Sequence, residues 1–286
     1  MIAPGAGTVG GAASILILLL LGAPAAAQDP KPKSDSLKNV ELCNGGGRTS
    51  PDVRIEGCTA LIQTVQASAA ALPIAYNNRG NAYVAKGDYD RAIQDFDQSI
   101  KLNATYGKPF NNRGVAYLRK GEYDLAITSF DEAIKLKPDY GEAMANRAEA
   151  WLKKRAYDRA VRDFDEAIRI NPGLPSVWNG RCWTRVLVGA LQEALEDCNK
   201  ALQTESGSAL AYDSRGLIYL KRGLFGAAID DFNSALRLDP KLPSALYGRG
   251  YARLKNGDKS GSDSDFAAAR TIDPGIDDIF ARYGVR

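Results

Sequence analysis

The chain repeats one pattern of apolar, small and polar positions every 34 residues between residues 73 and 276. The copies begin at Pro73, Gly107, Gly141, Pro175, Ala209 and Pro243. One column holds small residues: Gly80, Gly114, Ala148, Cys182, Gly216 and Gly250. Another is mainly phenylalanine: Phe96, Phe130, Phe164, Cys198, Phe232 and Phe266. A fixed period of this length predicts a solenoid, in which each copy buries its apolar face against its neighbours.

Within each copy, the pattern predicts two helices joined by a tight turn. In the first copy, Ala92, Phe96 and Ile100 follow the i, i+4, i+8 spacing of one helix face. Gly87 suits the left-handed end of the preceding helix, and Asp88 suits the N-cap of the next one. Proline then closes most copies, because a helix cannot continue through it: Pro138, Pro172, Pro240 and Pro274.

These residues closely resemble the tetratricopeptide repeat, whose motif is an aromatic residue, Gly and Tyr, then Ala, Phe, Ala and Pro. The second copy carries it as Phe110, Gly114, Tyr117, Ala126, Phe130, Ala133 and Pro138. The resemblance implies an all-α, right-handed superhelical solenoid of six hairpins, at 73–106, 107–140, 141–174, 175–208, 209–242 and 243–276. Arg185 and Arg253 depart from the motif by replacing the second aromatic residue, and we expect special surroundings in those two repeats.

The flanking segments carry other signals. An apolar run, Ile15 to Leu21, is followed by Ala25-Ala26-Ala27, which predicts a signal peptide over residues 1–27 and export to the periplasm or the exterior. No Lys or Arg precedes the run, so an uncleaved anchor stays an alternative. We expect a flexible polar leader at 28–42, an N-terminal cap or divergent half-repeat at 43–72, and a C-terminal capping helix at 277–286.

The four cysteines form two local pairs. Cys182 and Cys198 lie on opposite helices of the fourth hairpin, nearly equidistant from its turn, and Cys43 and Cys58 flank a glycine run. Even, locally paired cysteines in an exported chain predict the disulfides Cys43–Cys58 and Cys182–Cys198. The alternative is that each cysteine fills a small buried site as a free thiol. Exported bacterial tetratricopeptide proteins with such pairs resemble the whole chain, which implies a role in assembly or envelope maintenance.

Arginine and aspartate occupy two columns that lie 16 residues apart. Residues symmetric about a turn face each other, and semi-buried charges need partners. We therefore predict a structural salt-bridge ladder, with anion binding by the arginines as the alternative. Arg113 is the odd member, because Ser129 stands in place of its aspartate. The predicted pairs are Arg79–Asp95, Arg147–Asp163, Arg181–Asp197, Arg215–Asp231 and Arg249–Asp265.

The other face of each first helix lines a concave groove in this family. The resemblance implies that solvated asparagines there grip a peptide main chain: Asn77, Asn78, Asn81, Asn111, Asn112 and Asn146. Aromatic and apolar residues continue the groove: Trp183, Leu217, Tyr247 and Tyr251. A basic edge would favour acidic segments or a free carboxylate: Arg119, Lys153, Lys221 and Lys255. The alternative is an ordinary solvated surface.

Composition narrows the possible functions. The net charge of +3 is too small for a nucleic-acid-binding stripe, and the absence of histidine removes the commonest general base and metal ligand. We predict a non-catalytic protein–protein interaction scaffold of the cell envelope, with no cofactor, no metal and no membrane insertion after signal cleavage. The alternative is an accessory subunit of an envelope enzyme or assembly complex whose partner supplies catalysis. Segment 43–72 itself offers only Asp52 and Glu56 as acid–base residues.

Overall fold

The computed structural model describes residues 33–45, 49–64 and 70–285, and within these ranges every regular element is a helix. Helices α1 (Lys33–Asn44) and α2 (Pro51–Gln63) come first, and α15 (Ile276–Arg282) comes last. Between them lie α3 (Ala71–Ala85), α4 (Tyr89–Leu102), α5 (Gly107–Lys120), α6 (Tyr123–Leu136), α7 (Gly141–Lys153), α8 (Tyr157–Ile170), α9 (Pro175–Val188), α10 (Leu191–Thr204), α11 (Ala209–Lys221), α12 (Phe225–Leu238), α13 (Pro243–Lys255) and α14 (Lys259–Ile272). The predicted signal peptide lies outside the described residues.

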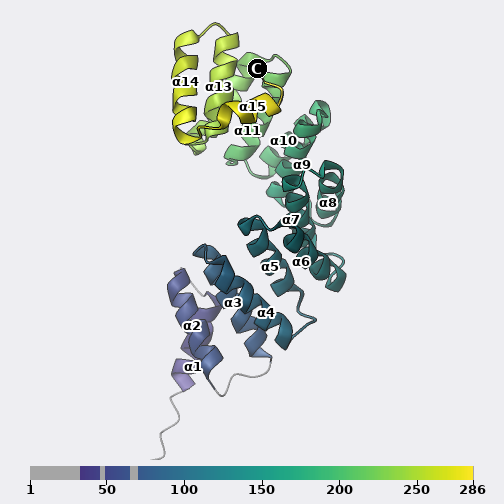
Figure 1. Cartoon of the computed structure of the whole chain (residues 1–286), viewed down its shortest axis with the longest axis vertical. Coiled ribbons are helices and arrows are strands. Elements are labelled where there is room, and N and C mark those ends of the chain that lie inside the picture. The colour runs from purple at the N-terminus through teal and green to yellow at the C-terminus, as the bar shows by residue number, and fades with distance from the viewer. Residues whose placement is uncertain (1–32, 46–48, 65–69, 286) are drawn as a thin grey trace, which may run out of the picture.

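The helices stack as an extended, curved array of antiparallel hairpins, with α1 and α2 at one end and α13 to α15 at the other (Figure 1). Each helix from α2 to α14 packs chiefly on the helices before and after it. The first helices of neighbouring hairpins also touch one another, from α3 through α5, α7, α9 and α11 to α13. The all-α solenoid expected from the period is therefore confirmed, and the first helices form its inner side. None of the helices in the described ranges is both long and apolar enough to cross a bilayer.

The glycine and phenylalanine columns meet inside the hairpins that carry both residues. A Cβ atom added to Gly80 would lie 2.6 Å from the Phe96 ring, and one on Gly114 would lie 2.5 Å from Phe130. Both rings are completely buried. Glycine is thus required by close contact at these two positions, since a side chain there would force the phenylalanine ring to shift.

Hairpin four replaces this contact with a covalent bond. Cys182 and Cys198 stand in the glycine and phenylalanine columns, and they form a disulfide with a Cα–Cα distance of 5.4 Å. Arg185 occupies the place of the second aromatic residue, and its Nη1 donates to Asp197 Oδ2 at 2.6 Å. Arg253 binds Asp265 in the same way at 2.9 Å. In repeats four and six, which depart from the motif, the special surroundings are therefore a second arginine that binds the buried aspartate of the hairpin.

The leader expected at 28–42 is wrong from residue 33 onward, because α1 occupies Lys33–Asn44. The helix is tied to α2 by the Cys43–Cys58 disulfide, with a Cα–Cα distance of 4.5 Å. Gly57 lets the two helices approach, since a Cβ there would lie 2.6 Å from Leu42 Cβ. The sequence of α1 has no clear apolar stripe, and Leu37 is accordingly 71% exposed. The N-terminal cap is therefore the hairpin of α1 and α2.

The C-terminal cap forms as a short helix. Ile276 and Phe280 of α15 are buried, and the helix contacts α13 and α14. It ends in a Schellman motif: the Val285 N–H donates to the Phe280 carbonyl at 3.1 Å, and Gly284 has a φ of +77°. Beyond this motif, Tyr283 meets Lys221 of α11 and Trp183 of α9, while α15 lies against α13 and α14 at the end of the array (Figure 1).

Candidate functional site

The asparagines of the inner surface form one continuous chain of hydrogen bonds, which we call the amide ladder. It runs from α7 through α5 and α3 to the end of α1. Each side-chain N–H₂ donates to the carbonyl oxygen of the next: Asn146 to Asn111 (3.0 Å), Asn111 to Asn112 (3.2 Å), Asn112 to Asn77 (2.9 Å), Asn77 to Asn78 (3.3 Å) and Asn78 to Asn44 (3.1 Å).

The expectation of independent, solvated amides is therefore wrong. Asn77 and Asn111 are buried, with 3% and 5% of their surface exposed, because each is held between amides of its own and the next hairpin. Asn78, Asn112 and Asn146 stay half-buried. An amide has two N–H donors and one oxygen with two lone pairs, so each of these three keeps capacity for a ligand. Asn81 is half-buried and lies outside the ladder.

Sequence reasoning missed Asn44 as the last acceptor of the ladder. Asn44 lies one 34-residue period before Asn78, and this spacing could have identified it. It was missed because the segment before residue 73 was not read as part of the repeat. At the other end the ladder stops at Asn146, because Ala145 and Gly180 supply no amide where the pattern would continue. The ladder is thus confined to the N-terminal half of the groove.

The C-terminal half of the groove has a different surface. Trp183 meets the ring of Tyr283 edge to face, with centroids 5.1 Å apart. The Tyr247 hydroxyl donates to Asp277 Oδ1 at 2.9 Å, and its ring lies 4.5 Å from that of Phe280. The predicted aromatic surface is therefore covered by the chain's own C-terminus.

Two further groove predictions differ in outcome. Leu217 is a core residue with 3% of its surface exposed, so its place on the groove surface is wrong. Tyr251 is half-buried, and its ring carries the Lys255 ammonium 5.1 Å from the centroid.

The basic edge is only partly free. Arg119 is exposed and lies 3.9 Å from Glu149 across the next hairpin, and Lys153 is exposed. Lys221 Nζ donates to the main-chain carbonyl of Tyr283 at 2.6 Å. The pKa of Lys221 is lowered by burial. The basic edge can thus attract anions along α5 and α7. On α11, Lys221 is already bound to the Tyr283 carbonyl.

Asp213 of α11 is a buried carboxyl beside this surface. Ser244 Oγ donates to its Oδ2 at 2.7 Å, and this is the one hydrogen bond that the described residues give it. Burial raises the pKa of Asp213 to about 7, and the Ser244 hydrogen bond lowers it less than burial raises it. Its charge also contributes to the raised pKa of Tyr283, after burial of that ring. Asp213 can therefore change its ionisation near neutral pH.

The arginine and aspartate columns meet between the helices of each hairpin, away from the groove surface. Arg181 binds Asp197 with two hydrogen bonds, Nε to Oδ2 at 2.9 Å and Nη2 to Oδ1 at 2.6 Å. The same fork joins Arg79 with Asp95, Arg147 with Asp163, Arg215 with Asp231, and Arg249 with Asp265.

Each arginine also has a second partner that sequence reasoning missed, in the hairpin before. For five of the six, Nη1 donates to a residue 16 positions earlier: Asp97 from Arg113, Asp131 from Arg147, Asp165 from Arg181, Asn199 from Arg215 and Asn233 from Arg249. Arg79 Nη1 donates instead to Thr59 Oγ1 of α2 at 3.1 Å. Arg113 lacks the aspartate of its own hairpin, and its Nε donates to Ser129 Oγ at 3.2 Å. Because the guanidinium N–H groups are engaged in this way, the arginine–aspartate ladder has little capacity left to bind an external anion.

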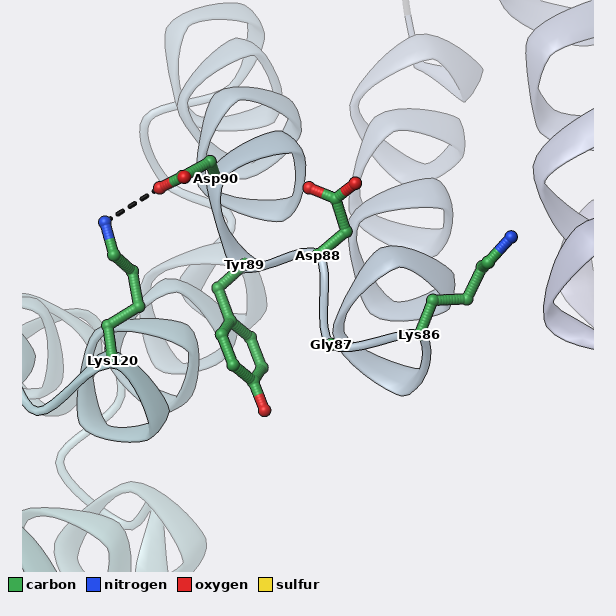
Figure 2. A pocket seen from close by; sticks show the side chains of 6 residues that line it. All are labelled: Lys86, Gly87, Asp88, Tyr89, Asp90 and Lys120. Carbon is green, nitrogen blue, oxygen red and sulfur yellow. Dashed lines mark hydrogen bonds and ion pairs between the residues drawn. The ribbon is translucent and has the colours of Figure 1, made fainter.

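A shallow depression lies at the turn of the first hairpin, apart from the groove, and Figure 2 shows its lining. Lys120 donates to Asp90 at 2.7 Å and joins two hairpins across it. Asp88 caps α4 by accepting from the Arg91 N–H at 3.2 Å. Asp90 pairs with Lys120, and Lys86 pairs with Asp52 of α2, so the lysines that line the depression are already engaged and it acts as a structural junction.

Comparison with known proteins bears on the fold. Models of the tetratricopeptide repeat match residues 73–106 and 111–175, and a TPR repeat model matches residues 216–257. No curated protein matches the chain.

Solved structures of similar fold are repeat proteins as well. A tetratricopeptide repeat protein from Parabacteroides merdae is 17% identical, with a TM-score of 0.66 over 88% of this chain and 98% of its own. PilF of Pseudomonas aeruginosa is 14% identical, with a TM-score of 0.65 over 72% and 94%. YrrB, a TPR protein with an unusual peptide-binding site, is 19% identical, with a TM-score of 0.50 over 63% and 92%. At these identities the likeness concerns the fold alone.

Proposed function

Because this chain is a tetratricopeptide repeat protein, we propose that it is a non-catalytic scaffold of the cell envelope whose groove binds extended protein segments. Proteins of this family generally act as interaction scaffolds, and YrrB is described as having a peptide-binding site. The finer assignment concerns this chain's own groove, and specifically the half formed by α3, α5 and α7.

The amide ladder carries the proposal. An extended peptide offers N–H and C=O groups along its length, and amides pair with both without requiring one side-chain sequence. The ladder fixes the orientation of each amide, since turning one would break the bond to the next. Fixed donors and acceptors lose little conformational freedom on binding, which favours affinity. Lys153 and Arg119 at the rim add attraction for acidic segments.

The envelope location is supported by two independent features. Disulfides persist in oxidising compartments such as the periplasm, and both cysteine pairs are bonded. The apolar run followed by Ala25-Ala26-Ala27 reads as a secretory signal, although it lies outside the described residues. We therefore place the folded scaffold outside the cytoplasm.

Site-specific photocrosslinking tests the binding face. The full chain, carrying p-benzoylphenylalanine at Asn81 in the groove or at exposed Gln98 on α4, is irradiated in its native envelope extract. We expect protein adducts from position 81 and none from position 98. Adducts from position 98 alone would move the binding face to the outer side.

The cross-linked segment, made as a synthetic peptide, then tests the amides. Each lost hydrogen bond contributes about 0.5–1.5 kcal/mol, so Asn78→Ala, Asn112→Ala and Asn146→Ala together should raise the Kd by more than about tenfold. Thr128→Ala on α6 serves as the control. An unchanged Kd for the triple variant would refute a role of the ladder in binding.

A further inference from the structure

The last residues of the chain reach further along the groove than a cap requires. Capping needs only the apolar contacts of Ile276 and Phe280 against the final hairpin. Tyr283, however, contacts Lys221 on α11 and Trp183 on α9, in the two hairpins before the last. Tyr283 therefore reaches the first helices of two earlier hairpins, α9 and α11, while α15 itself covers α13.

The contacts made by this tail are those that a bound peptide would receive. An aromatic side chain lies against Trp183 at right angles, with an interplanar angle of 86°, and a main-chain carbonyl accepts a hydrogen bond from Lys221. The Val285 side chain is buried in the apolar core against which Trp183 packs. Aromatic anchors and main-chain hydrogen bonds are the usual sources of affinity and register in peptide recognition.

Lys221 is incompletely matched by the tail. Its ammonium is bound to a neutral carbonyl, and it forms no ion pair within the described ranges. A carboxylate would add the attraction between two opposite unit charges, which a neutral carbonyl does not supply. A ligand with a carboxylate at this point would thus bind Lys221 more tightly than the tail does.

We propose that the segment Tyr283–Val285 is an intramolecular occupant of the groove, which gives way to a protein segment that presents an aromatic side chain to Trp183 and a carboxylate to Lys221. A free C-terminus that ends in tyrosine has both groups on one residue. The proposal rests on the proposed function, since it names the partner chemistry for the C-terminal half of the same groove.

The local backbone provides a hinge for this exchange. Gly284 has a φ of +77°, in the left-handed region that a residue with a side chain adopts at a cost. A Cβ at this position would meet only Lys221 Nζ, at 4.0 Å, so a substitution acts through backbone strain and leaves the groove surface intact. Gly284→Val should therefore loosen the tail while the residues that face the ligand stay unchanged.

Peptide binding in solution tests the proposal. The probe is a fluorescein-labelled hexapeptide ending in Ala-Arg-Tyr, with a free C-terminal carboxylate in one form and an amide in the other. Fluorescence anisotropy measures its Kd for the full chain and for a chain ending at Arg282, which retains α15. Because an occupied groove reduces the binding-competent fraction, the shortened chain should bind the acid peptide at least about tenfold more tightly. The amidated peptide should lose most of this gain.

Two variants make the test decisive. Trp183→Ala in the shortened chain should weaken binding by about tenfold or more, as expected for an aromatic anchor. Gly284→Val in the full chain should tighten binding, which keeps the test valid if the shortened chain unfolds. Equal Kd values for all chains, or no effect of Trp183→Ala, would overturn the proposal. Thr128→Ala on α6 should leave this Kd unchanged. The peptide reports on Trp183 and Lys221 of α9 and α11, so failure here is distinguishable from failure of the amide ladder on α3, α5 and α7.

Discussion

Arg147 joins two hairpins through a single guanidinium group. Its Nε and Nη2 donate to Asp163 of its own hairpin at 2.8 and 2.7 Å, and its Nη1 donates to Asp131 of the preceding hairpin at 2.6 Å. The hydrogen bond to Asp163 is the largest contribution to the raised pKa of Arg147. Asp163 is buried, whereas Asp131 is exposed. Five directed donors are what allow one arginine to serve both partners.

The two aspartates should therefore differ in their effect on stability. Asp163→Ala leaves a shielded guanidinium without its carboxylate and should lower the free energy of unfolding by about 3 kcal/mol. Asp131→Ala removes a solvent-exposed partner and should cost less than about 1 kcal/mol. Urea unfolding of the two variants beside the parent chain measures both. Equal losses of unfolding free energy would show that the buried Arg147–Asp163 pair contributes no more than the exposed Arg147–Asp131 pair.

The disulfide of hairpin four should be replaceable by the packing it displaced. Cys182→Ala with Cys198→Ala removes the cross-link and leaves a void, and should cost about 3 kcal/mol or more. Cys182→Gly with Cys198→Phe rebuilds the contact seen between Gly80 and Phe96. This second pair should recover part of the lost stability, measured by thermal unfolding under oxidising conditions. A Gly/Phe variant no more stable than the Ala/Ala variant would refute the equivalence.

The amide ladder should contribute to folding as well as to binding. Asn111→Ala removes the acceptor of Asn146 and the donor to Asn112 at a buried site, so it should destabilise the chain by about 1–3 kcal/mol. Asn81→Ala, outside the ladder, should change the free energy of unfolding by less than about 0.5 kcal/mol. Denaturant titration compares the two variants, and matching values would contradict the ladder.

Asp213 should make stability fall as the pH rises from about 4 to 7. Its folded pKa of about 7 exceeds the ordinary value of 3.8, so in this window the folded chain keeps a proton that the unfolded chain has released. Below the window both states are protonated, and above it the full penalty is present. A raised pKa of this size corresponds to a penalty of at most about 4 kcal/mol.

Asp213→Asn should remove this dependence, because an amide does not ionise. The variant should resemble the parent at pH 4 and be more stable at pH 8, with Asp239→Asn on an exposed turn as the control. Urea unfolding at both pH values measures the difference. Parallel pH profiles for parent and variant would mean that Asp213 is ionised in the folded protein.

Local patterns in the sequence were sufficient for the hairpins and for what lies inside them. The Arg147–Asp163 and Cys182–Cys198 contacts follow from residues placed symmetrically about one short turn, so spacing alone predicts them. The period likewise predicts the stacking, because no hairpin can bury its apolar face alone. The repeat architecture and the pairs inside each hairpin can therefore be predicted from residue spacing.

Contacts between hairpins and at the two ends depend on how the hairpins pack against one another. The approach of α5 to α3 brings Asn112 onto Asn77, and it turns apparently solvated amides into a ladder. Helix α1 has no clear apolar stripe of its own, and its disulfide to α2 and its close packing there hold it in place. Tyr283, which follows α15, meets Trp183 of α9, two hairpins before the last. Such contacts join residues of different hairpins, and the way in which the repeats stack determines which of these groups meet.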